Sequence, residues 1–275
     1  MHTCRTIETH TERRLRRRAK PPISWRHALT PVALLLFVAL WDLLVRWGGY
    51  PAFVLPGPGR VAARFVQALQ DGTLQAHVVV TLGEVFGGLT LGLTVALMLG
   101  YLLAKSRPLE RILAPCIVAS QAVPIVALAP LLVIWFGVGS FSKVLVCALT
   151  LFFPVLINTI VGIRSVDSDL VDLMRSLEAT RWQIFRYLEV PAALPVLFGG
   201  LKVGVTLSVI GAVVGEFVGA DRGLGFLVNL ARGLFDTPLM FVALFTLMAI
   251  ALTLYLLVSL LESALLRWRW PEDGA

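Results

Sequence analysis

The chain has 275 residues, of which 57% are hydrophobic and 15% are charged. This composition is too apolar for a soluble domain and indicates an integral membrane protein. The formal net charge is +7, but the basic residues are concentrated at the N-terminus and in short segments between apolar runs. That distribution is typical of membrane topology and does not favour a nucleic-acid partner.

The N-terminal segment, residues 1–27, is polar and strongly basic. We expect it to form a cytoplasmic tail that fixes the orientation of the chain; binding to anionic membrane lipid is the alternative. A cleaved signal peptide is not expected, because the basic region is long and the next apolar run lacks a small-residue cleavage site.

Six apolar runs follow the tail, each near the roughly 20 residues that a helix needs to cross the hydrocarbon. They cover residues 28–47, 78–104, 113–136, 142–163, 196–218 and 239–266. The sequence therefore predicts an all-α integral membrane protein with six transmembrane helices, followed by a second tail at residues 267–275. An even number of spans places both termini on the same side.

Lysine and arginine set the orientation of these spans. The two tails, the loop after the second span and the segment after the fourth span are rich in them, whereas the opposite loops carry few. Positive residues favour the cytoplasmic side of a membrane. We therefore expect a multi-pass membrane protein with both termini in the cytoplasm.

Between the first two spans lies the stretch VLPGPGRVAARFVQAL. Its Pro-Gly pairs break the chain, and the apolar residues that follow lie on one side of a helix. We expect an external interfacial helix packed against the bundle, so that residues 28–73 comprise the first span and this segment. The apolar face is formed by Val61, Phe65, Val66 and Leu69.

Prolines and small residues interrupt the third and fifth spans. Pro124 and Pro130 lie in the third, where a proline bends the helix axis and frees a carbonyl. Gly211 and Gly215 lie in the fifth at a spacing that permits close helix approach. These residues are candidates for a transport path or gate, and plain helix packing is the alternative for each.

Few ionisable residues fall within the predicted spans, and each is costly in lipid unless it faces protein or water. Lys202 and Glu216 lie on one predicted helix, about 21 Å apart, which is too far for them to pair. For Glu216 we expect a structural role at the outer end of the fifth span, near Arg222; a place in the path or gate is the alternative. The remaining two are Asp42 and Glu84.

A long polar segment, residues 164–195, separates the fourth span from the fifth. Its apolar residues recur at helical spacing and predict two short amphipathic helices. Ser168 or Asp169 is expected to cap the first helix. Pro191 and Pro195 are expected to end the second helix and to restart the chain as a new span. The apolar positions are Leu170, Leu173, Met174, Leu177, Trp182, Phe185 and Leu188.

This polar segment resembles the cytoplasmic coupling loop of permease subunits in bacterial ATP-binding-cassette (ABC) importers. The signature of that loop is E-A-A, three residues, G, nine residues and I-x-L-P. Asp172 stands at the acidic position of the signature. The positions of I, L and P are taken by Leu188, Val190 and Pro191.

Two departures from the signature fall at its centre. Leu173 and Met174 replace the two alanines, and Glu178 replaces the glycine that permits a tight turn between the short helices. A glutamate forced to positive φ costs roughly 1 kcal/mol or more. The turn is therefore either strained or built differently from the family's turn.

Other stretches carry the same resemblance, which covers about residues 30–265. The L-P-x-P stretch after the first span and QAVPIVALAPLLVIWFGVG in the third are similar to importers of the nitrate, sulfonate, taurine, hydroxymethylpyrimidine and riboflavin group. The amino-acid sequence of residues 124–139 and 143–159 is most similar to that of the vitamin and vitamin-precursor permeases. Riboflavin or hydroxymethylpyrimidine is therefore expected as substrate before sulfonate, taurine or nitrate.

The resemblance implies a type I ABC importer transmembrane domain with residues 74–266 as its core. It implies two copies of a cytoplasmic ATP-binding subunit, an extracytoplasmic substrate-binding protein and a second permease copy, which we expect to form a homodimer. It implies a place in the bacterial plasma (inner) membrane, where the chain would work by alternating access in membrane lipid and would supply no bond chemistry. The residues implied to contact the ATP-binding subunit are Asp172, Leu173, Met174, Leu177, Glu178, Ala179, Trp182 and Pro191.

Several other functions are not supported by the sequence. There is no G-x-x-x-x-G-K-[ST] phosphate loop, no G-x-S-x-G and no H-E-x-x-H, so we expect neither an enzyme nor a cofactor or metal site. An ion-coupled secondary transporter is an alternative, but such proteins place coupling carboxylates at mid-membrane. An integral membrane enzyme is a second alternative, for which no catalytic set is present.

Overall fold

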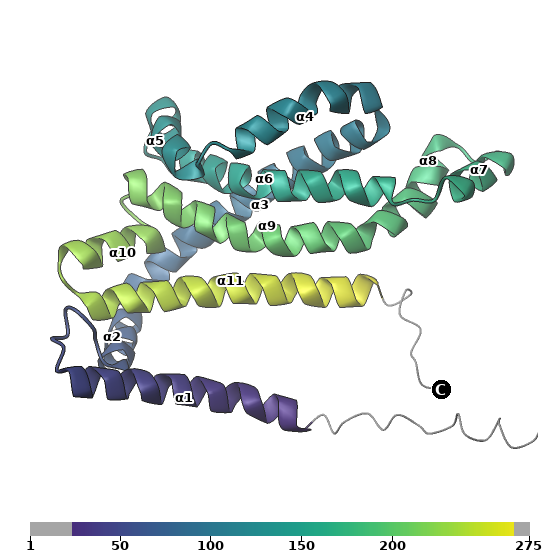
Figure 1. Ribbon diagram of the computed structural model, residues 1–275. Coiled ribbons are helices and arrows are strands. Elements are labelled where there is room, and N and C mark those ends of the chain that lie inside the picture. Colours follow the sequence, from purple (N-terminus) through teal and green to yellow (C-terminus); the bar gives the residue numbers. More distant parts are fainter. Residues whose placement is uncertain (1–23, 267–275) are drawn as a thin grey trace, which may run out of the picture. The chain divides into compact units, whose positions relative to one another are not determined.

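The computed structural model describes residues 24–266, with side chains from residue 32 onward. The chain divides into two compact units. The first ends at Tyr50 and contains α1 (Ser24–Gly48); the second begins at Pro51 and contains all the other helices (Figure 1). Every regular element among the described residues is helical.

The second unit contains four long helices connected by shorter ones. Its elements are α2 (Pro58–Gln70), α3 (Thr73–Lys105), α4 (Arg107–Gln121), α5 (Ile125–Phe136), α6 (Ser140–Arg164), α7 (Ser168–Ser176), α8 (Arg181–Ile184), the π-helical segment η2 (Phe185–Glu189), α9 (Val190–Gly219), α10 (Leu224–Gly233) and α11 (Thr237–Leu265).

Helices α3, α6 and α9 form the centre of the second unit, and α6 packs along both of the others. Glycines permit this packing. A Cβ atom added at Gly88 of α3 would lie 2.2 Å from Cβ of Cys147 on α6, and one at Gly211 of α9 would lie 2.9 Å from Cα of the same cysteine. Helices in a membrane associate through such van der Waals contact.

Helix α11 packs beside α9, α10 and α2. Lys202 of α9 donates to the carboxylate of Glu262 on α11, so it pairs with a neighbouring helix. Near the start of α11, Asp236 accepts a 2.9 Å hydrogen bond from Nε of Arg64 on α2. The amphipathic helix predicted between the first two spans is therefore confirmed as α2, in which Val61 is buried. Its position outside the cell stays a prediction.

Four helical stretches of the described chain are long and apolar enough to cross a membrane: Thr73–Lys105, Ser140–Arg164, Arg181–Gly219 and Thr237–Leu265. The count becomes five if α4 and α5 form one broken span. Three of these stretches match the second, fourth and sixth predicted spans to within a few residues. The first predicted span coincides with α1, and the total of six stays a prediction.

The prediction for the third span, residues 113–136, is wrong in one respect: the bend expected at its prolines divides the stretch into two helices. The chain breaks between α4 and α5, whose axes differ by 94°. Pro124 causes the break, because it caps α5 in an extended conformation and disfavours helical geometry in the residue before it. Pro115 and Pro130 lie inside their helices.

The prediction that Pro191 and Pro195 end one helix and start another is also wrong. The chain runs as one helical stretch from Arg181 to Gly219. The π-helical turn over Phe185–Glu189 immediately precedes Pro191, and the amide of Val190 bonds to the carbonyl of Phe185. This wider turn accommodates a proline ring that would clash with the carbonyl four residues earlier in an α-helix.

Candidate coupling site

The segment between α6 and α9, residues 165–189, is called the coupling segment below. It extends beyond the ends of these two helices, where α7 and α8 form a tip (Figure 1). The first predicted short helix is present as α7, whereas the second begins as α8 and continues through η2 into α9, so it is not a separate helix. Asp167 caps α7, since its side chain accepts a 3.0 Å hydrogen bond from the amide of Asp169. The cap therefore lies one residue before Ser168 and two before Asp169, the two predicted positions.

The turn after α7 holds Glu178 at φ 59°, in the left-handed region. The amide of Glu178 bonds to the carbonyl of Arg175 over 2.9 Å, and that of Ala179 bonds to the carbonyl of Met174 over 3.0 Å. These two bonds form a Schellman motif, in which the position of Glu178 is usually glycine. The chain thus makes the family's tight turn without the glycine and bears the backbone strain.

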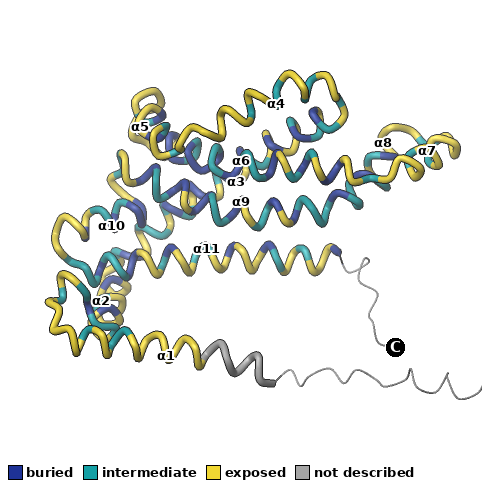
Figure 2. Tube along the Cα trace, in the orientation of Figure 1, coloured by how far each residue is buried: buried dark blue, intermediate teal, exposed yellow. Residues whose placement is uncertain are grey.

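Apolar side chains are exposed around this turn. Leu173, Leu177 and Trp182 are 54%, 69% and 66% exposed, and the tip is mostly exposed in Figure 2. Met174 and Ala179 are half-buried beside them. A cluster of large exposed apolar residues on a polar segment is typical of a docking surface for another protein.

Helix α8 is short, but its N-terminus is capped by side-chain hydrogen bonds. The Thr180 hydroxyl accepts from the amide of Gln183, and the Gln183 side chain accepts from the amide of Thr180 over 2.7 Å. This capping box satisfies the free amides at the start of the helix. The Trp182 and Phe185 rings lie 5.4 Å apart, which continues the apolar surface into the π-helical segment.

The π-helical segment is attached to the last turn of α3. Glu189 is 3% exposed, and its carboxylate accepts from the Lys105 ammonium and from the Tyr101 hydroxyl, the latter over 3.3 Å. The Tyr101 ring also meets Phe185 edge-on, with centroids 5.1 Å apart. The exit of the coupling segment is therefore fixed to α3 by an ion pair, a hydrogen bond and a ring contact.

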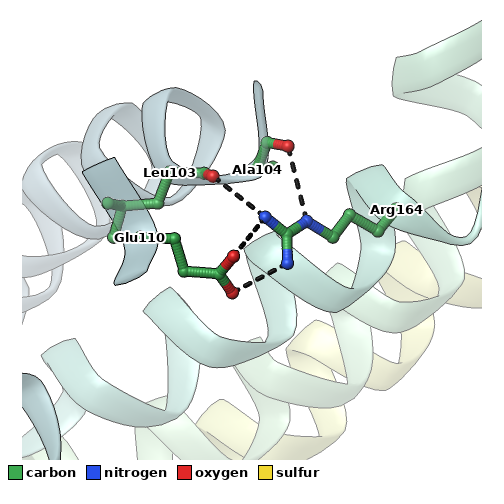
Figure 3. A network of polar contacts seen from close by, with 4 residues as sticks. All are labelled: Leu103, Ala104, Glu110 and Arg164. Carbon is green, nitrogen blue, oxygen red and sulfur yellow. Dashed lines mark hydrogen bonds and ion pairs between the residues drawn. The ribbon is translucent and has the colours of Figure 1, made fainter. Parts of the chain in front are cut away.

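The entrance of the coupling segment is attached to the same turn of α3. Arg164, the last residue of α6, donates Nη1 and Nη2 to the two carboxylate oxygens of Glu110 on α4, over 2.7 and 2.5 Å (Figure 3). It also donates to the carbonyls of Leu103 and Ala104, over 3.2 and 3.4 Å. A cation at the C-terminus of a helix complements its free carbonyls and its dipole.

Four of the five residues proposed from the sequence as path or gate, all except Glu216, lie in different surroundings. Gly211 and Gly215 are buried where α9 meets α6; a Cβ atom at Gly215 would lie 3.0 Å from Cγ of Lys143. Pro124 lies at the break before α5, and Pro130 lies within α5. The structure does not bring these four residues together at one point.

Glu216 is 1% exposed near the end of α9. Its carboxylate accepts a 2.7 Å hydrogen bond from the Thr81 hydroxyl of α3 and another from the amide of Gly225, at the start of α10. The expected contact between Glu216 and the segment that follows α9 is present. Among the described residues, however, Glu216 bonds to Thr81 and Gly225 in place of the expected partner Arg222. Glu216 thereby connects α3, α9 and α10.

Several residues of these contacts were not identified from the sequence. Lys143 lies at the start of the fourth predicted span and is not among the candidate residues, but it is 2% exposed in α6 and its ammonium donates to backbone carbonyls, including that of Gly219 at 2.7 Å. Glu189 carried no signal beyond lying in a polar segment. Among residues 24–266, no group of His, Cys, Asp and Glu side chains could hold a metal ion.

Comparison with known proteins places this arrangement in a family. Residues 88–267 match the family described as "Binding-protein-dependent transport system inner membrane component". The riboflavin transport system permease protein RibX of Chloroflexus aurantiacus is 54% identical over 244 residues, covering 89% of this chain and 91% of that protein. The formylaminopyrimidine transport permease protein ThiX of Halalkalibacterium halodurans is 36% identical, covering 88% and 96%.

A solved structure shares the fold. A chain of the MetNI methionine ABC transporter, in an inward-facing conformation, superposes with a TM-score of 0.61 at 20% identity, covering 70% of this chain and 95% of that one. The match between the family and this chain extends over α6, the coupling segment and α9, where the site lies. The chain therefore belongs to the family of inner-membrane components of binding-protein-dependent transport systems, and it is the permease of an ABC importer.

Proposed function

We propose that this permease carries riboflavin, or a closely related vitamin precursor, into the bacterial cell. The observation that supports this substrate is the 54% identity to a riboflavin transport permease along 91% of that protein's length. The identity to a formylaminopyrimidine permease is 36%, and that to a sulfonate permease of Bacillus subtilis is 32%. Riboflavin is therefore tested first.

The experiment is uptake by proteoliposomes that contain this permease, its ATP-binding subunit and its substrate-binding protein. We expect radiolabelled riboflavin to enter only when ATP is present on the side of the ATP-binding subunit. Formylaminopyrimidine, taurine and an aliphatic sulfonate serve as competitors. Transport of one of these competitors, with no transport of riboflavin, would overturn the proposed substrate.

The tip of the coupling segment is proposed to dock the ATP-binding subunit. Its exposed apolar residues Leu173, Leu177 and Trp182 supply the anchors, while Asp172 and Glu178 supply charge at the rim. Met174 and Ala179 are half-buried behind the turn and are joined by one of the two backbone bonds of the Schellman motif. Pro191 contributes indirectly, because it follows the π-helical turn that orients the tip.

The complete importer is proposed to contain two permease copies, two ATP-binding subunits and one external binding protein. The four to five apolar helical stretches of the described chain are too few to enclose a path alone, which supports a homodimer. The positive residues of both tails support cytoplasmic termini. The family core is proposed to span residues 74–266, with residues 28–73 as an added first span and interfacial helix.

The break between α4 and α5 is proposed to line the path. Non-helical backbone at membrane depth is tolerated only where it is buried in protein or faces a water-filled cavity. The break at Pro124 provides such backbone, and Val126 and Ile134 of α5 are 60% and 75% exposed in the isolated chain. Cysteines at these two positions should react with a soluble thiol reagent at rates that depend on nucleotide.

A further inference from the structure

The coupling segment is attached at both ends to one turn of one helix. At the entrance, Arg164 bonds to the carbonyls of Leu103 and Ala104. At the exit, Glu189 accepts from Tyr101 and Lys105. The four partners fall within five consecutive residues of α3, although the two ends of the segment are 25 residues apart (189 minus 164).

We infer that the last turn of α3, residues Tyr101–Lys105, receives the motion of the tip of the coupling segment. Arg164 and Glu189 are positioning residues, because their contacts make the tip and α3 move together. This inference rests on the proposed docking of an ATP-binding subunit at the tip. It adds a transmitting element that lies outside the coupling segment itself.

The chemistry of the two attachments supports a rigid connection. Arg164 donates both terminal nitrogens to Glu110, a bidentate geometry that fixes direction as well as distance (Figure 3). Glu110 lies in the first turn of α4. The guanidinium therefore joins the end of α6, the end of α3 and the start of α4 at one point.

The second attachment is shielded from solvent on the carboxylate side. The Glu189 side chain is 4% exposed, whereas that of Lys105 is 45% exposed. A buried carboxylate that loses its cation is left uncompensated, so the pair resists separation when the tip moves. The contact between the Tyr101 and Phe185 rings adds an apolar connection between the same two elements.

Helix α3 is suited to carry the motion further. It is one unbroken helix from Thr73 to Lys105, and it packs along α6 for much of its length. Near its other end, Thr81 bonds to Glu216 of α9 and accepts from the amide of Leu224 on α10. A displacement of the turn that holds Lys105 therefore reaches the contacts around Glu216 through a single rigid element.

The test measures how many ATP molecules are hydrolysed for each riboflavin imported by proteoliposomes that contain the complete transporter. The variants are Arg164→Gln and Glu189→Gln, which remove charge but keep polar side chains of similar size. We expect both to retain the ATP-binding subunit and to raise this ratio about two- to thirtyfold, the range for residues on a coupling network.

The matched control is Arg64→Gln. Arg64 pairs with Asp236 with a side-chain exposure close to that of Arg164, but the pair lies between α2 and α11. We expect its ratio to equal that of the wild type. Arg164→Lys keeps the charge and a donor for the carbonyls, so it should restore part of the coupling lost in Arg164→Gln.

Each outcome decides the inference. A wild-type ratio in both Arg164→Gln and Glu189→Gln would overturn it, and so would an equal rise in Arg64→Gln. Loss of the ATP-binding subunit from either variant would place the residue in docking rather than in transmission and would also overturn it. A wild-type transporter without ATP-driven uptake would overturn the proposed function, and this inference with it.

Discussion

The Thr81 hydroxyl donates a 2.7 Å hydrogen bond to Oε1 of Glu216, which lies 135 residues further along the chain. The same hydroxyl accepts from the amide of Leu224 over 2.8 Å. Gly223 has a φ of 111°, and a Cβ atom there would lie 2.3 Å from the Glu216 carboxyl carbon. The carboxylate therefore occupies the space that a side chain at Gly223 would need.

Two substitutions of Glu216 distinguish the effect of its charge from the effect of its hydrogen bonds. Glu216→Gln should retain at least partial riboflavin uptake, because the amide oxygen still accepts one of the two bonds. Glu216→Leu should lower stability, since each buried donor left without an acceptor costs about 1–3 kcal/mol. Thermal unfolding in detergent measures the loss. Abolished uptake in Glu216→Gln, with normal assembly and ATP hydrolysis, would instead place the residue in the path or gate.

Thr81 provides an independent check on the same contact. Thr81→Ser keeps the hydroxyl and should unfold near the wild-type temperature. Thr81→Val has a similar shape but no hydroxyl, so it leaves the Leu224 amide and the Glu216 carboxylate short of partners and should unfold at a lower temperature. Equal unfolding temperatures for the two variants would show that the hydrogen bonds contribute little.

The proposed docking surface is tested at Leu177, which is 69% exposed. An apolar anchor in an interface contributes about 2 kcal/mol or more, so Leu177→Asp should weaken binding of the ATP-binding subunit by roughly thirtyfold. Co-purification measures the loss. Tyr187→Ser is the control, since Tyr187 is 71% exposed but lies outside the proposed surface. Wild-type yield of the complex with Leu177→Asp would contradict the docking site.

The strained turn predicts a stabilising substitution. Glu178→Gly removes the Cβ atom from a residue at φ 59° and should stabilise the turn by about 1 kcal/mol. Hydrogen exchange of the Ala179 amide, which bonds to Met174, should then slow about fivefold. Glu178→Ala keeps the Cβ atom and should show no such slowing. Equal protection in the two variants would assign the effect to the lost charge.

The orientation of the chain is tested by labelling of single cysteines in intact cells. Gly59→Cys and Arg222→Cys should react with an impermeant thiol reagent added outside, whereas Ser168→Cys should not. Both Gly59 and Arg222 are exposed, and a Cβ atom at Gly59 meets no other atom within 4 Å. Labelling of Ser168→Cys from outside would reverse the topology and remove the tip from the cytoplasm.

The long helices and the two short helices of the tip could be predicted from the sequence because they depend on local patterns. Apolar length predicts a span, and helical spacing predicts an amphipathic helix. Pro124 was identified as a source of bending, but the 94° angle was not, because a proline's effect depends on the packing around it. The same limit applies to Pro191, which a π-helical turn accommodates.

The contacts that fix the tip to α3 could not be predicted. Arg164 and Leu103 are 61 residues apart, and Glu189 and Lys105 are 84 residues apart. No local pattern marks such pairs, and a single sequence does not indicate which charged residues contact each other in the fold. The departure at Glu178 was visible from the signature, and the structure answers the question that it raised: the turn keeps its shape, and the backbone is strained.

The π-helical turn at Phe185–Glu189 has a consequence for the rotational phase of the tip. Each residue of an α-helix advances about 100° around the axis and 1.5 Å along it, so a π turn holds one residue more than the α-helical turn that it replaces. Deleting one residue there would convert the π turn into an α-helical turn and leave the direction of Trp182 relative to α9 nearly unchanged, whereas deleting one residue within α9 would rotate it by about 100°. The π-helical turn therefore absorbs one additional residue between the tip and α9 while the direction in which the tip faces is kept.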